Sequence, residues 1–519
     1  MNNFAALVRA LGRPETAQTS GERAAAPRWF WGALLLVAAL GIVQASLRLG
    51  DSLNVDEPFT ANLIRLPLPA MFAAFRQDNA SPPYYLLLKL WAALFGESEV
   101  ALRSLSVLLF GATIVTVGAV ARREAGPLAG MVAATLLATS SNLGLVHAGT
   151  ARQYALLCLE AALAVALCFA LLRATPGPIA GPQTRRLWLL LLLLDVVGSL
   201  THATFVFVMG ASVVAALLVS RRLFLAMLGV STIAGLIYLA LWGPMLLATL
   251  PLPITSWMRP PQPIDLYYGI RTLWGWKRGL LLAAYLAILL ALRFRQLPGL
   301  LRSPPHLFGL IFMATALLAP YIVSQIKPVY NPDRTPVLAL PIVCVLSGML
   351  IGRLGLRALT LGFIAVIAVA SLQFEVKAAL QPDPIPTRQS MAYLTSMLRC
   401  GDTLVLGGLT VSEVEYYLRR FDAPECIARV TFPADTARHP GWIDVTGLDA
   451  RRAELAREAE ATVAQISRRQ GARVWLFTGT DYGQEPTPII QQELDRKLAY
   501  QTTFDLIGSF FKWIRVYSV

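Results

Sequence analysis

The sequence predicts a polytopic α-helical membrane protein that ends in a soluble α/β domain. The chain has 519 residues, of which 56% are hydrophobic, and its mean hydropathy is +0.57. Apolar runs of roughly 18 residues or more recur before residue 380, and each is long enough to cross a bilayer core of ~30 Å. After residue 380 the long runs stop, and charged residues alternate with short apolar stretches.

This pattern predicts about eleven transmembrane helices. Their expected bounds are 29–48, 101–121, 127–146, 151–172, 187–200, 203–220, 223–249, 278–294, 307–326, 335–352 and 357–378. The first apolar run follows an arginine-containing segment of about 28 residues and lacks the small-residue cleavage site of a removable signal peptide. Residues 1–28 are therefore expected to form a cytoplasmic N-terminal segment.

The net charge of +14 comes from the membrane half of the chain. From residue 380 onward there are 16 Lys and Arg against 17 Asp and Glu, and the rest of the chain has 29 against 14. The basic clusters fall on alternate connections: Arg122 with Arg123, Arg173 with Arg185 and Arg186, Arg221 with Arg222, Arg293 with Arg295 and Arg302, and Arg353 with Arg357. This distribution indicates a cytoplasmic N-terminus and, with an odd number of spans, an extracytoplasmic C-terminal domain. Nucleic-acid binding is the weaker explanation of the charge.

Two outer segments are expected within a transmembrane domain that covers residues 29–379. The first outer loop, 49–100, contains "LPAMFAAFRQ" and "PPYYLLLKLWAALFG", which favour amphipathic helices along the membrane surface. The second segment, 250–277, is rich in Pro, Trp and Tyr, as is typical of an interfacial loop.

Residues 380–519 predict the α/β domain. "DTLVLGG" and "ARVWLFTG" are typical of buried strands, and "TVSEVEYYLRRF" and "PTPIIQQELDRKL" are typical of helices. "ARRAELAREAEATVAQISRRQG" predicts a charged helix closed by Gly471, and "FDLIGSFFKWIRVYSV" predicts a terminal pair of strands. Cys400 and Cys426 are the only cysteines of this domain and the candidate disulfide pair of an oxidising compartment.

Ionisable residues gather at the outer ends of the expected spans. They are Asp56, Glu57, Asp78, Arg103, Arg152, His202, Lys327, Asp333 and Arg334. Because a charge near hydrocarbon is costly, such residues are either paired or functional. Simpler roles stay open: acids at the start of a surface helix, basic anchors that reach the headgroups, an Asp333–Arg334 pair, and a packing histidine.

Four motifs, taken in order, resemble those of the C-type, lipid-phosphate-dependent glycosyltransferases. The resemblance is to the bacterial branch that is similar to protein mannosyltransferases and the lipid A aminoarabinose transferase. The motifs are "NVDE", "DNASPPYYLLLKLW", "TARQYALLCLEAAL" and "KPVYNPDRTPVLALP", and "THATF" resembles the Thr-His-aromatic turn of the same branch. Two positions depart from the family: Ser81 stands where many relatives have His, and Thr335 stands where relatives commonly have Tyr.

The resemblance, which spans residues 29–352, implies a membrane enzyme of the bacterial plasma membrane. It implies transfer of a sugar, with inversion, from a polyprenyl phosphate to an acceptor hydroxyl on the outer face. It implies catalysis by Asp56 as the base with Glu57 beside it. It implies substrate binding by Asp78, Arg152, Tyr154, His202, Lys327, Tyr330 and Arg334, of which Lys327 and Arg334 contact the donor phosphate.

Several questions stay open at this stage. A divalent cation at Asp56, Glu57 or Asp78 is one, since separate carboxylates fix neither ligand number nor geometry. A transporter or flippase of a lipid-linked sugar is the alternative function, although the sequence shows no internal repeat typical of transporters. The sugar, the acceptor (protein, lipid or glycan) and the role of the C-terminal domain are also open.

Overall fold

The chain divides into two compact units. The computed structural model describes residues 27–519 except 55, 78–79, 142, 144–146, 175–180, 251–257, 408–409, 436–449, 470 and 479–485. The transmembrane unit comprises the residues up to 49, 103–243 and 260–380, and the tail unit comprises 50–102, 244–259 and 381–519. In the C-terminal half of the chain, the change from one unit to the other falls between Leu380 and Gln381. The first outer loop, however, belongs with the tail and not with the transmembrane helices, because long-range hydrogen bonds join it to residues after 380.

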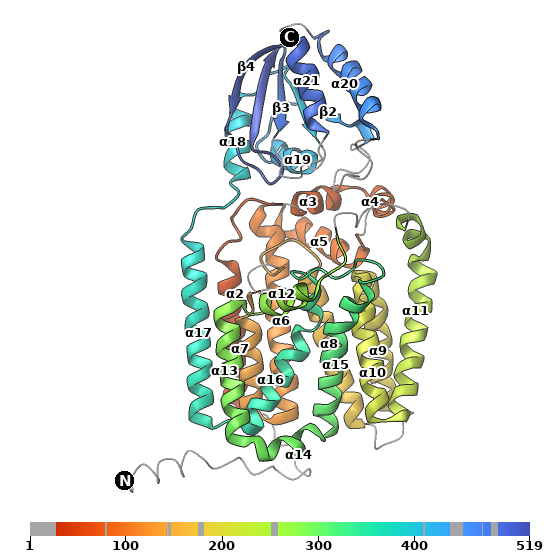
Figure 1. The fold of residues 1–519 in the computed structure, drawn as a ribbon, viewed down its shortest axis with the longest axis vertical. Helices are drawn as coiled ribbons and strands as arrows, with labels where there is room; N and C mark the ends of the chain where they lie inside the picture. Colours follow the sequence, from red (N-terminus) through yellow and green to blue (C-terminus); the bar gives the residue numbers. More distant parts are fainter. Residues whose placement is uncertain are drawn as a thin grey trace. The chain divides into compact units, whose positions relative to one another are not determined.

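The transmembrane unit is built of helices, most of which run side by side (Figure 1). The helices are α2 Arg28–Ser46, α6 Glu99–Ala125, α7 Pro127–Ala138, α8 Tyr154–Ala174, α9 Pro182–Thr201, η2 Ala203–Phe205, α10 Val206–Val219, α11 Arg221–Thr249, α12 Pro263–Thr272, α13 Gly275–Arg293, η3 Phe294–Gln296, α14 Leu297–Leu301, α15 Pro304–Val323, η4 Thr335–Leu338, α16 Leu340–Leu354 and α17 Arg357–Ala379.

A helix lies at each of the eleven predicted positions, so the multi-pass helical class is confirmed. Within the described residues, seven helices are long and apolar enough to cross a membrane: Arg28–Ser46, Glu99–Ala125, Tyr154–Ala174, Arg221–Thr249, Gly275–Leu300, Pro304–Val323 and Arg357–Ala379. Three further apolar helices are shorter: Pro127–Ala138, Ala203–Val219 and Leu340–Leu354. Eleven crossings therefore stay a prediction.

Two of the predicted spans are shorter in the structure. α7 ends at Ala138 and not at residue 146, and the Ser140 hydroxyl donates to the Leu273 carbonyl at 2.7 Å. A serine that bonds elsewhere competes with the helical backbone. The tenth span begins as an α-helix at Leu340 and not at residue 335. Pro341 has no N–H to donate to the preceding turn, so an α-helix through this point would be broken.

α7 and α16 approach each other closely. A Cβ at Gly348 would lie 2.5 Å from the Ala129 carbonyl oxygen, and a Cβ at Gly352 would lie 2.6 Å from the Ala129 Cβ. Small residues one turn apart are what allows membrane helices to pack backbone against backbone. This contact matters for function, because the segment after α7 and the segment before α16 carry residues of the candidate site.

The tail unit contains a five-stranded sheet of order β2-β1-β3-β5-β4. Its strands are β1 Thr403–Gly407, β2 Ala428–Phe432, β3 Arg473–Thr478, β4 Ala499–Phe504 and β5 Trp513–Ser518. β1 is parallel to β2 and β3, whereas β5 is antiparallel to β3 and β4. The helices of this unit are α3 Glu57–Arg65, α4 Leu68–Phe75, α5 Pro82–Phe95, α18 Thr387–Met397, α19 Thr410–Arg420, α20 Arg452–Ile466 and α21 Thr487–Lys497.

Side chains alternate across β3, as they must in a strand. Val474 and Leu476 belong to one buried cluster with Leu455 of α20 and Ile490 of α21. Helices α20 and α21 therefore cover this face of the sheet (Figure 1). Phe477 packs against Phe511 on the opposite face, with ring centroids 5.1 Å apart.

The region after residue 380 thus contains strands and helices of the predicted α/β class, with corrections. Strand β2 and helix α18 are additional to the prediction. Strand β4 begins at Ala499, before the stretch predicted to hold the terminal pair, because it pairs with β5 from Ala499 to Phe504. The charged helix α20 ends at Ile466, before the predicted closing residue Gly471.

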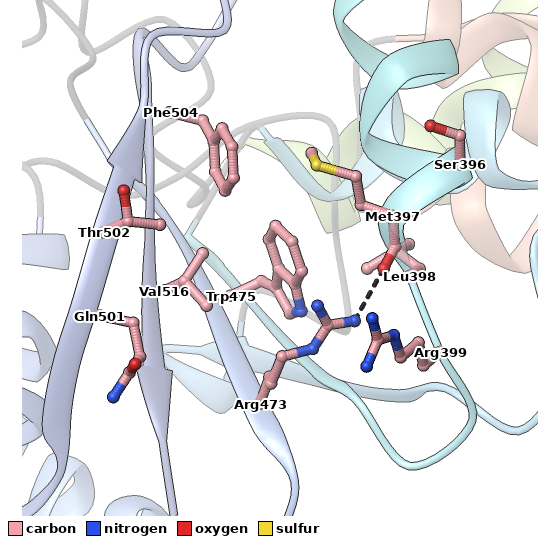
Figure 2. A pocket seen from close by; sticks show the side chains of 10 residues that line it. All are labelled: Ser396, Met397, Leu398, Arg399, Arg473, Trp475, Gln501, Thr502, Phe504 and Val516. Atoms are coloured by element: carbon pink, nitrogen blue, oxygen red, sulfur yellow. Dashed lines mark hydrogen bonds between the residues drawn. The ribbon is translucent and has the colours of Figure 1, made fainter.

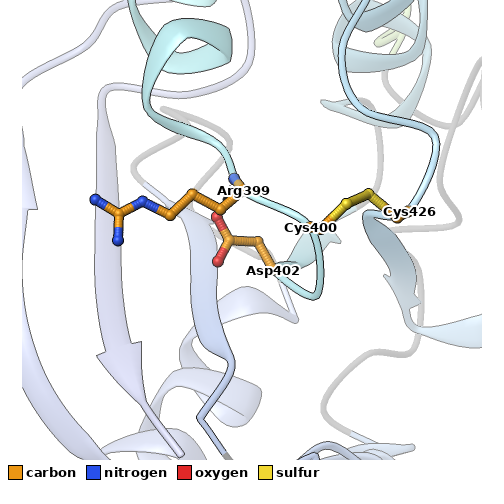
Figure 3. Close-up of a disulfide and its surroundings, with 4 residues drawn as sticks. All are labelled: Arg399, Cys400, Asp402 and Cys426. Atoms are coloured by element: carbon orange, nitrogen blue, oxygen red, sulfur yellow. Dashed lines mark hydrogen bonds between the residues drawn. A yellow bond between two sulfur atoms is a disulfide. The ribbon is translucent and has the colours of Figure 1, made fainter.

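Cys400 and Cys426 form a disulfide, which confirms the predicted pair (Figure 3). It joins the turn after α18 to the loop before β2. Beside it the Gly401 N–H donates to the Cys426 carbonyl at 3.3 Å. The Arg399 N–H donates to the Asp402 carboxylate at 2.9 Å. The remaining cysteines are buried free thiols of the transmembrane unit, Cys158, Cys168 and Cys344.

Thiol counting tests the disulfide. The protein unfolded in denaturant without reductant is expected to expose three alkylatable thiols, and five after reduction. Intact mass after iodoacetamide treatment measures the number. The double variant Cys400→Ser, Cys426→Ser is the control, with the same count under both conditions. Five reactive thiols in the unreduced wild type would contradict the disulfide.

Candidate active site

Asp56 and Glu57 lie at the N-terminus of α3 in the tail unit. Asp56 is half-buried and immediately precedes the helix, and Glu57 is its first residue and is 1% exposed. Pro58 follows, where its fixed φ favours helix initiation. The Asp56 carbonyl accepts the Thr60 N–H at 3.1 Å, and the Glu57 carboxylate accepts the Asn54 N–H at 3.3 Å. The positive end of the helix dipole therefore stabilises negative charge on both side chains.

The segment before the two acids is bound by residues from after position 380. The Ser52 N–H and hydroxyl donate to the Asp383 carboxylate at 2.8 and 2.6 Å, and the Ser52 hydroxyl accepts the Arg388 N–H at 3.0 Å. The Leu53 N–H donates to the Tyr417 hydroxyl at 2.8 Å. Ser52, Leu53 and Tyr417 are all fully buried. Such bonds are costly to lose, because an unpaired buried polar group costs about 1–3 kcal/mol.

Helix α3 itself packs on α19. The Asn62 amide donates to the Ser412 carbonyl at 2.9 Å, and the Arg419 guanidinium donates to the Asn62 side-chain oxygen. Glu413 of α19 is fully buried, and its carboxylate accepts the Thr387 hydroxyl of α18 at 2.7 Å. Burial raises the pKa of Glu413 above its ordinary value. The helix that begins with the candidate acids is therefore held by a buried polar network of the tail.

A second group of candidate residues lies in the transmembrane unit, and we refer to it as the Arg–His cluster: His147, Arg152, Tyr154, His202 and Arg334. The ring centroids of His147 and Tyr154 are 4.6 Å apart, and those of Tyr154 and His202 are 6.0 Å apart. The Arg334 guanidinium carbon lies 5.7 Å from the centroid of the Tyr154 ring. Arg152 and Arg334 both act electrostatically on the two histidines. The structure thus brings together four of the predicted substrate-binding residues and adds His147.

Hydrogen bonds define the tautomers of the two histidines, which lie outside the membrane-crossing helices. His147 Nε2 lies 2.9 Å from the Asp333 carbonyl oxygen, which only accepts, so Nε2 carries the proton. His202 Nδ1 accepts the Thr204 N–H at 3.2 Å, so in the neutral ring the proton is on Nε2. Burial, reinforced by the two arginines of the cluster, lowers the pKa of each histidine to about 4. Both are therefore neutral hydrogen-bond donors at neutral pH.

The turn that carries His202 is fixed by buried contacts. The Thr201 hydroxyl donates to the Glu160 carboxylate of α8 at 2.8 Å. The Phe205 ring packs so closely on Gly198 that a Cβ there would lie 2.6 Å from it. The first contact joins the end of α9 to α8, the helix that begins with Tyr154, and the second packs η2 against α9.

The loop before η4 carries Tyr330 and Arg334. The Ser324 hydroxyl oxygen accepts the Tyr330 N–H at 2.6 Å, and the Tyr330 hydroxyl donates to the Asp265 carbonyl at 3.3 Å. Burial, together with nearby negative charge, raises the pKa of Tyr330 to about 12. A Cβ at Gly269 would collide with the Tyr330 hydroxyl, so this close approach requires glycine. Tyr330 is only 4% exposed, and this geometry suits it for positioning the loop.

Other predicted residues are placed differently. Lys327 is exposed, and no contact among the described residues joins it to Arg334. Asp78 lies outside the described residues. Among the His, Cys, Asp and Glu residues that the structure describes, no group of three is arranged to hold a metal ion.

His147 is the residue that sequence reasoning missed. It lies just after the predicted third span, in "LVHAGTARQY", five positions before Arg152. The signal in the sequence that could have indicated a functional role was the short distance from His147 to the "TARQY" motif. It was weak, because a lone histidine beside an apolar run is usually a packing residue.

A hollow of about 510 Å³ lies on the sheet of the tail unit, between α18 and strands β4 and β5 (Figure 2). Trp475 lines this hollow and stacks on Phe504, with ring centroids 5.8 Å apart. Arg473 lies over the same ring at 4.9 Å and is paired with Asp402 at 2.6 Å. Arg399 is exposed at its rim. None of the predicted site residues lines this hollow.

Comparison with known proteins supports the fold. No protein-family profile matches the chain, and no curated protein does. Among solved structures, its neighbours are C-type membrane glycosyltransferases, as the motifs predict. The crystal structure of ArnT from Cupriavidus metallidurans, a lipid A aminoarabinose transferase, bound to undecaprenyl phosphate has a TM-score of 0.61 at 15% identity, covering 95% of this chain and 99% of that chain. Apo ArnT has a TM-score of 0.62 at 15% identity over 94% and 98%. The oligosaccharyltransferase of Archaeoglobus fulgidus with Zn and sulfate reaches 0.49 at 12% identity over 94% and 73%.

The lowered histidine pKa values predict acid sensitivity. Histidine in an unfolded chain titrates near 6.5, whereas His147 and His202 titrate near 4 in the folded state. Between these values the unfolded chain binds more protons, so stability is lost as the pH falls from 6.5 towards 4. The loss is at most ~1.4 kcal/mol per pH unit for each group. Melting temperature in detergent from pH 8 to pH 4 measures it. The double variant His147→Gln, His202→Gln should show a shallower decline, and an unchanged decline would contradict the assignment.

Proposed function

We propose that this protein is a membrane glycosyltransferase that moves a sugar from a polyprenyl phosphate to an acceptor hydroxyl. The observation that carries the proposal is the fold shared with ArnT over 95% of the chain. That ArnT structure holds undecaprenyl phosphate. The motifs "NVDE", "TARQY" and "KPVYNPDR" of this chain supply the carboxylates and arginines that this chemistry needs.

Asp56 is the proposed general base. An acceptor hydroxyl is a poor nucleophile, and a carboxylate within hydrogen-bond reach assists attack by accepting its proton. Asp56 is half-buried, whereas Glu57 is buried and bound to the Asn54 N–H, so Asp56 is the better placed of the two to meet a substrate. The acceptor oxygen bonds to the anomeric carbon as the bond from that carbon to the phosphate oxygen breaks. Attack opposite the departing phosphate inverts the anomeric centre.

The Arg–His cluster is the proposed site of the donor phosphate. The leaving phosphate takes the bonding electrons, so negative charge develops on its oxygen. Arg334 suits that charge because its planar guanidinium forms two parallel hydrogen bonds, and Arg152 adds a second fixed cation. His202 contributes an Nε2–H donor without adding charge. Lys327 and Asp78 keep their predicted substrate-binding roles as part of this proposal, and Tyr330 positions the loop that carries Arg334.

The reaction is proposed to take place on the outer face of the bacterial inner membrane. The alternating basic clusters favour an N-terminus in the cytoplasm and a tail outside. On that face a lipid-linked sugar serves as donor in place of a nucleotide sugar.

A direct assay tests the proposal and separates it from lipid transport. Purified protein is incubated with undecaprenyl-phosphate mannose or undecaprenyl-phosphate aminoarabinose, together with lipid A or a serine-containing peptide. Covalent transfer and release of undecaprenyl phosphate are expected. The same assay with and without EDTA decides whether a divalent cation is needed. Movement of the donor across vesicles without any covalent product would favour the transporter.

Replacement of the base is expected to remove transfer while leaving the fold intact. Asp56→Asn keeps the shape but cannot accept the proton, so turnover should fall by at least ~10²-fold, as is typical for loss of general-base catalysis. Asp505→Asn neutralises an exposed acid elsewhere in the tail and serves as the control, with turnover near that of wild type. Near-normal turnover by Asp56→Asn would refute the assignment.

Arg334 is expected to act on both donor binding and the leaving group. Arg334→Lys keeps the charge but loses the planar fork, so it should already be harmful. Arg334→Ala should raise KM for the donor and lower kcat together. Turnover against donor concentration measures both, with Arg302→Ala, an exposed arginine elsewhere, as the control. Wild-type kinetics in Arg334→Ala would show that this arginine is only a membrane anchor.

A further inference from the structure

We infer that Tyr417, a residue of the tail, positions the segment that carries Asp56 and thereby sets the rate of transfer. The inference rests on the proposed function, because it assumes that Asp56 is the base. It assigns a role to the region after residue 380, which the motifs of the transferase family leave unexplained.

The contact is direct and close to the acids. The Leu53 N–H donates to the Tyr417 hydroxyl at 2.8 Å, and Leu53 and Tyr417 are both completely buried. Only two residues, Asn54 and Val55, separate Leu53 from Asp56. Because three peptide units join Leu53 to Asp56, the position of Leu53 limits where Asp56 can lie.

The tyrosine is itself held rigidly. Its ring is stacked on Phe421, with centroids 6.0 Å apart, and meets Tyr416 edge to face at 4.9 Å. Its helix, α19, is tied through the buried Glu413 carboxylate to Thr387, Ser509 and Phe510. The hydroxyl oxygen is thus a fixed acceptor and not a side chain that follows the loop.

A second bond fixes the register of the same segment. Ser52 immediately precedes Leu53, and its N–H donates to the Asp383 carboxylate at 2.8 Å. Two consecutive backbone N–H groups are therefore held by side chains from the region after residue 380. The segment cannot move along its own axis without breaking two hydrogen bonds, of which the Leu53–Tyr417 bond is buried.

Such control of position matters most to the chemical step. A base acts only within hydrogen-bond reach of the acceptor proton, and a misplacement of about 1 Å can cost on the order of 10²-fold in rate. Loss of the Tyr417 hydroxyl should therefore lower kcat, whereas KM for a donor held by the Arg–His cluster should change little. A purely structural role would instead lower the amount of folded protein and leave kcat per folded molecule unchanged.

The test compares Tyr417→Phe with Tyr416→Phe in the full-length protein. Tyr416 is the adjacent tyrosine of the same helix, is also buried, and donates its hydroxyl to the Glu97 carbonyl at 2.9 Å, at the other end of the first loop. Both variants lose one hydrogen bond of a tyrosine hydroxyl, but only Tyr417→Phe loses it next to the acids. Ser52→Ala, which removes a hydroxyl from the same segment, is a second variant in case Tyr417→Phe folds poorly.

Two measurements are made on each variant: hydrogen exchange of the amides of residues 50–54, and kcat and KM with undecaprenyl-phosphate mannose or aminoarabinose. Tyr417→Phe should exchange faster in this segment and lose roughly 10- to 100-fold in kcat with little change in KM. Tyr416→Phe should match wild type in both. Faster exchange with wild-type kcat would overturn the positioning role, and unchanged exchange would overturn the anchoring contact.

The outcome for wild type separates the two proposals. If wild type transfers sugar and Tyr417→Phe does so at the same kcat, the inference about Tyr417 fails while the proposed function stands. If wild type transfers nothing with either donor, the proposed function fails. The effect of Tyr417 on the rate then fails with it, and the exchange data report only whether the Leu53–Tyr417 contact exists.

Discussion

Charge near hydrocarbon has to be paired or hydrogen-bonded, and this constraint shapes the transmembrane unit. Arg278 of α13 shows the structural solution: its Nε donates to the Trp274 carbonyl at 3.0 Å, and one NH group donates to the Ser371 hydroxyl at 2.8 Å. Glu375 lies 3.9 Å from the same guanidinium and balances its charge. Here an arginine joins two helices and its bonds are used within the protein. In the Arg–His cluster, the Arg334 guanidinium lies 5.7 Å from the centroid of the Tyr154 ring, and Arg152 and Arg334 both act electrostatically on the two neutral histidines.

The same constraint explains which parts of the fold could be predicted. Helices in a membrane satisfy their own backbone groups, so an apolar run of sufficient length indicates a helix almost by itself. Their ends are set by individual side chains, and these were predicted less well. Ser140 bonds to Leu273, 133 positions away, and ends α7 early. In the tail, β4 was misplaced because its pairing with β5 depends on partners that the local pattern does not reveal.

The candidate site was predictable to the extent that it consists of motifs. Asp56, Arg152 and Arg334 lie in short motifs from which a role in glycosyl transfer was predicted. Contacts made over long separations were not predictable. The bond from Leu53 to Tyr417 spans 364 positions, and nothing in either segment alone indicates the other. The first loop, whose helices were expected, accordingly groups with the residues after position 380.

The neutral state of His147 and His202 gives the Arg–His cluster a defined charge. A lipid phosphate that bears a sugar carries one negative charge, and the phosphate that leaves carries up to two. In the proposed binding of the donor phosphate, Arg152 and Arg334 supply two fixed positive charges, which match the charge of the leaving phosphate better than that of the donor. Protonated histidines would raise the total to four, favouring donor and product alike and slowing release. Neutral rings donate hydrogen bonds without adding positive charge. The attraction between the arginines and the phosphate therefore grows as negative charge develops on the phosphate. Stronger binding of the transition state than of the ground state is the condition for accelerating the chemical step.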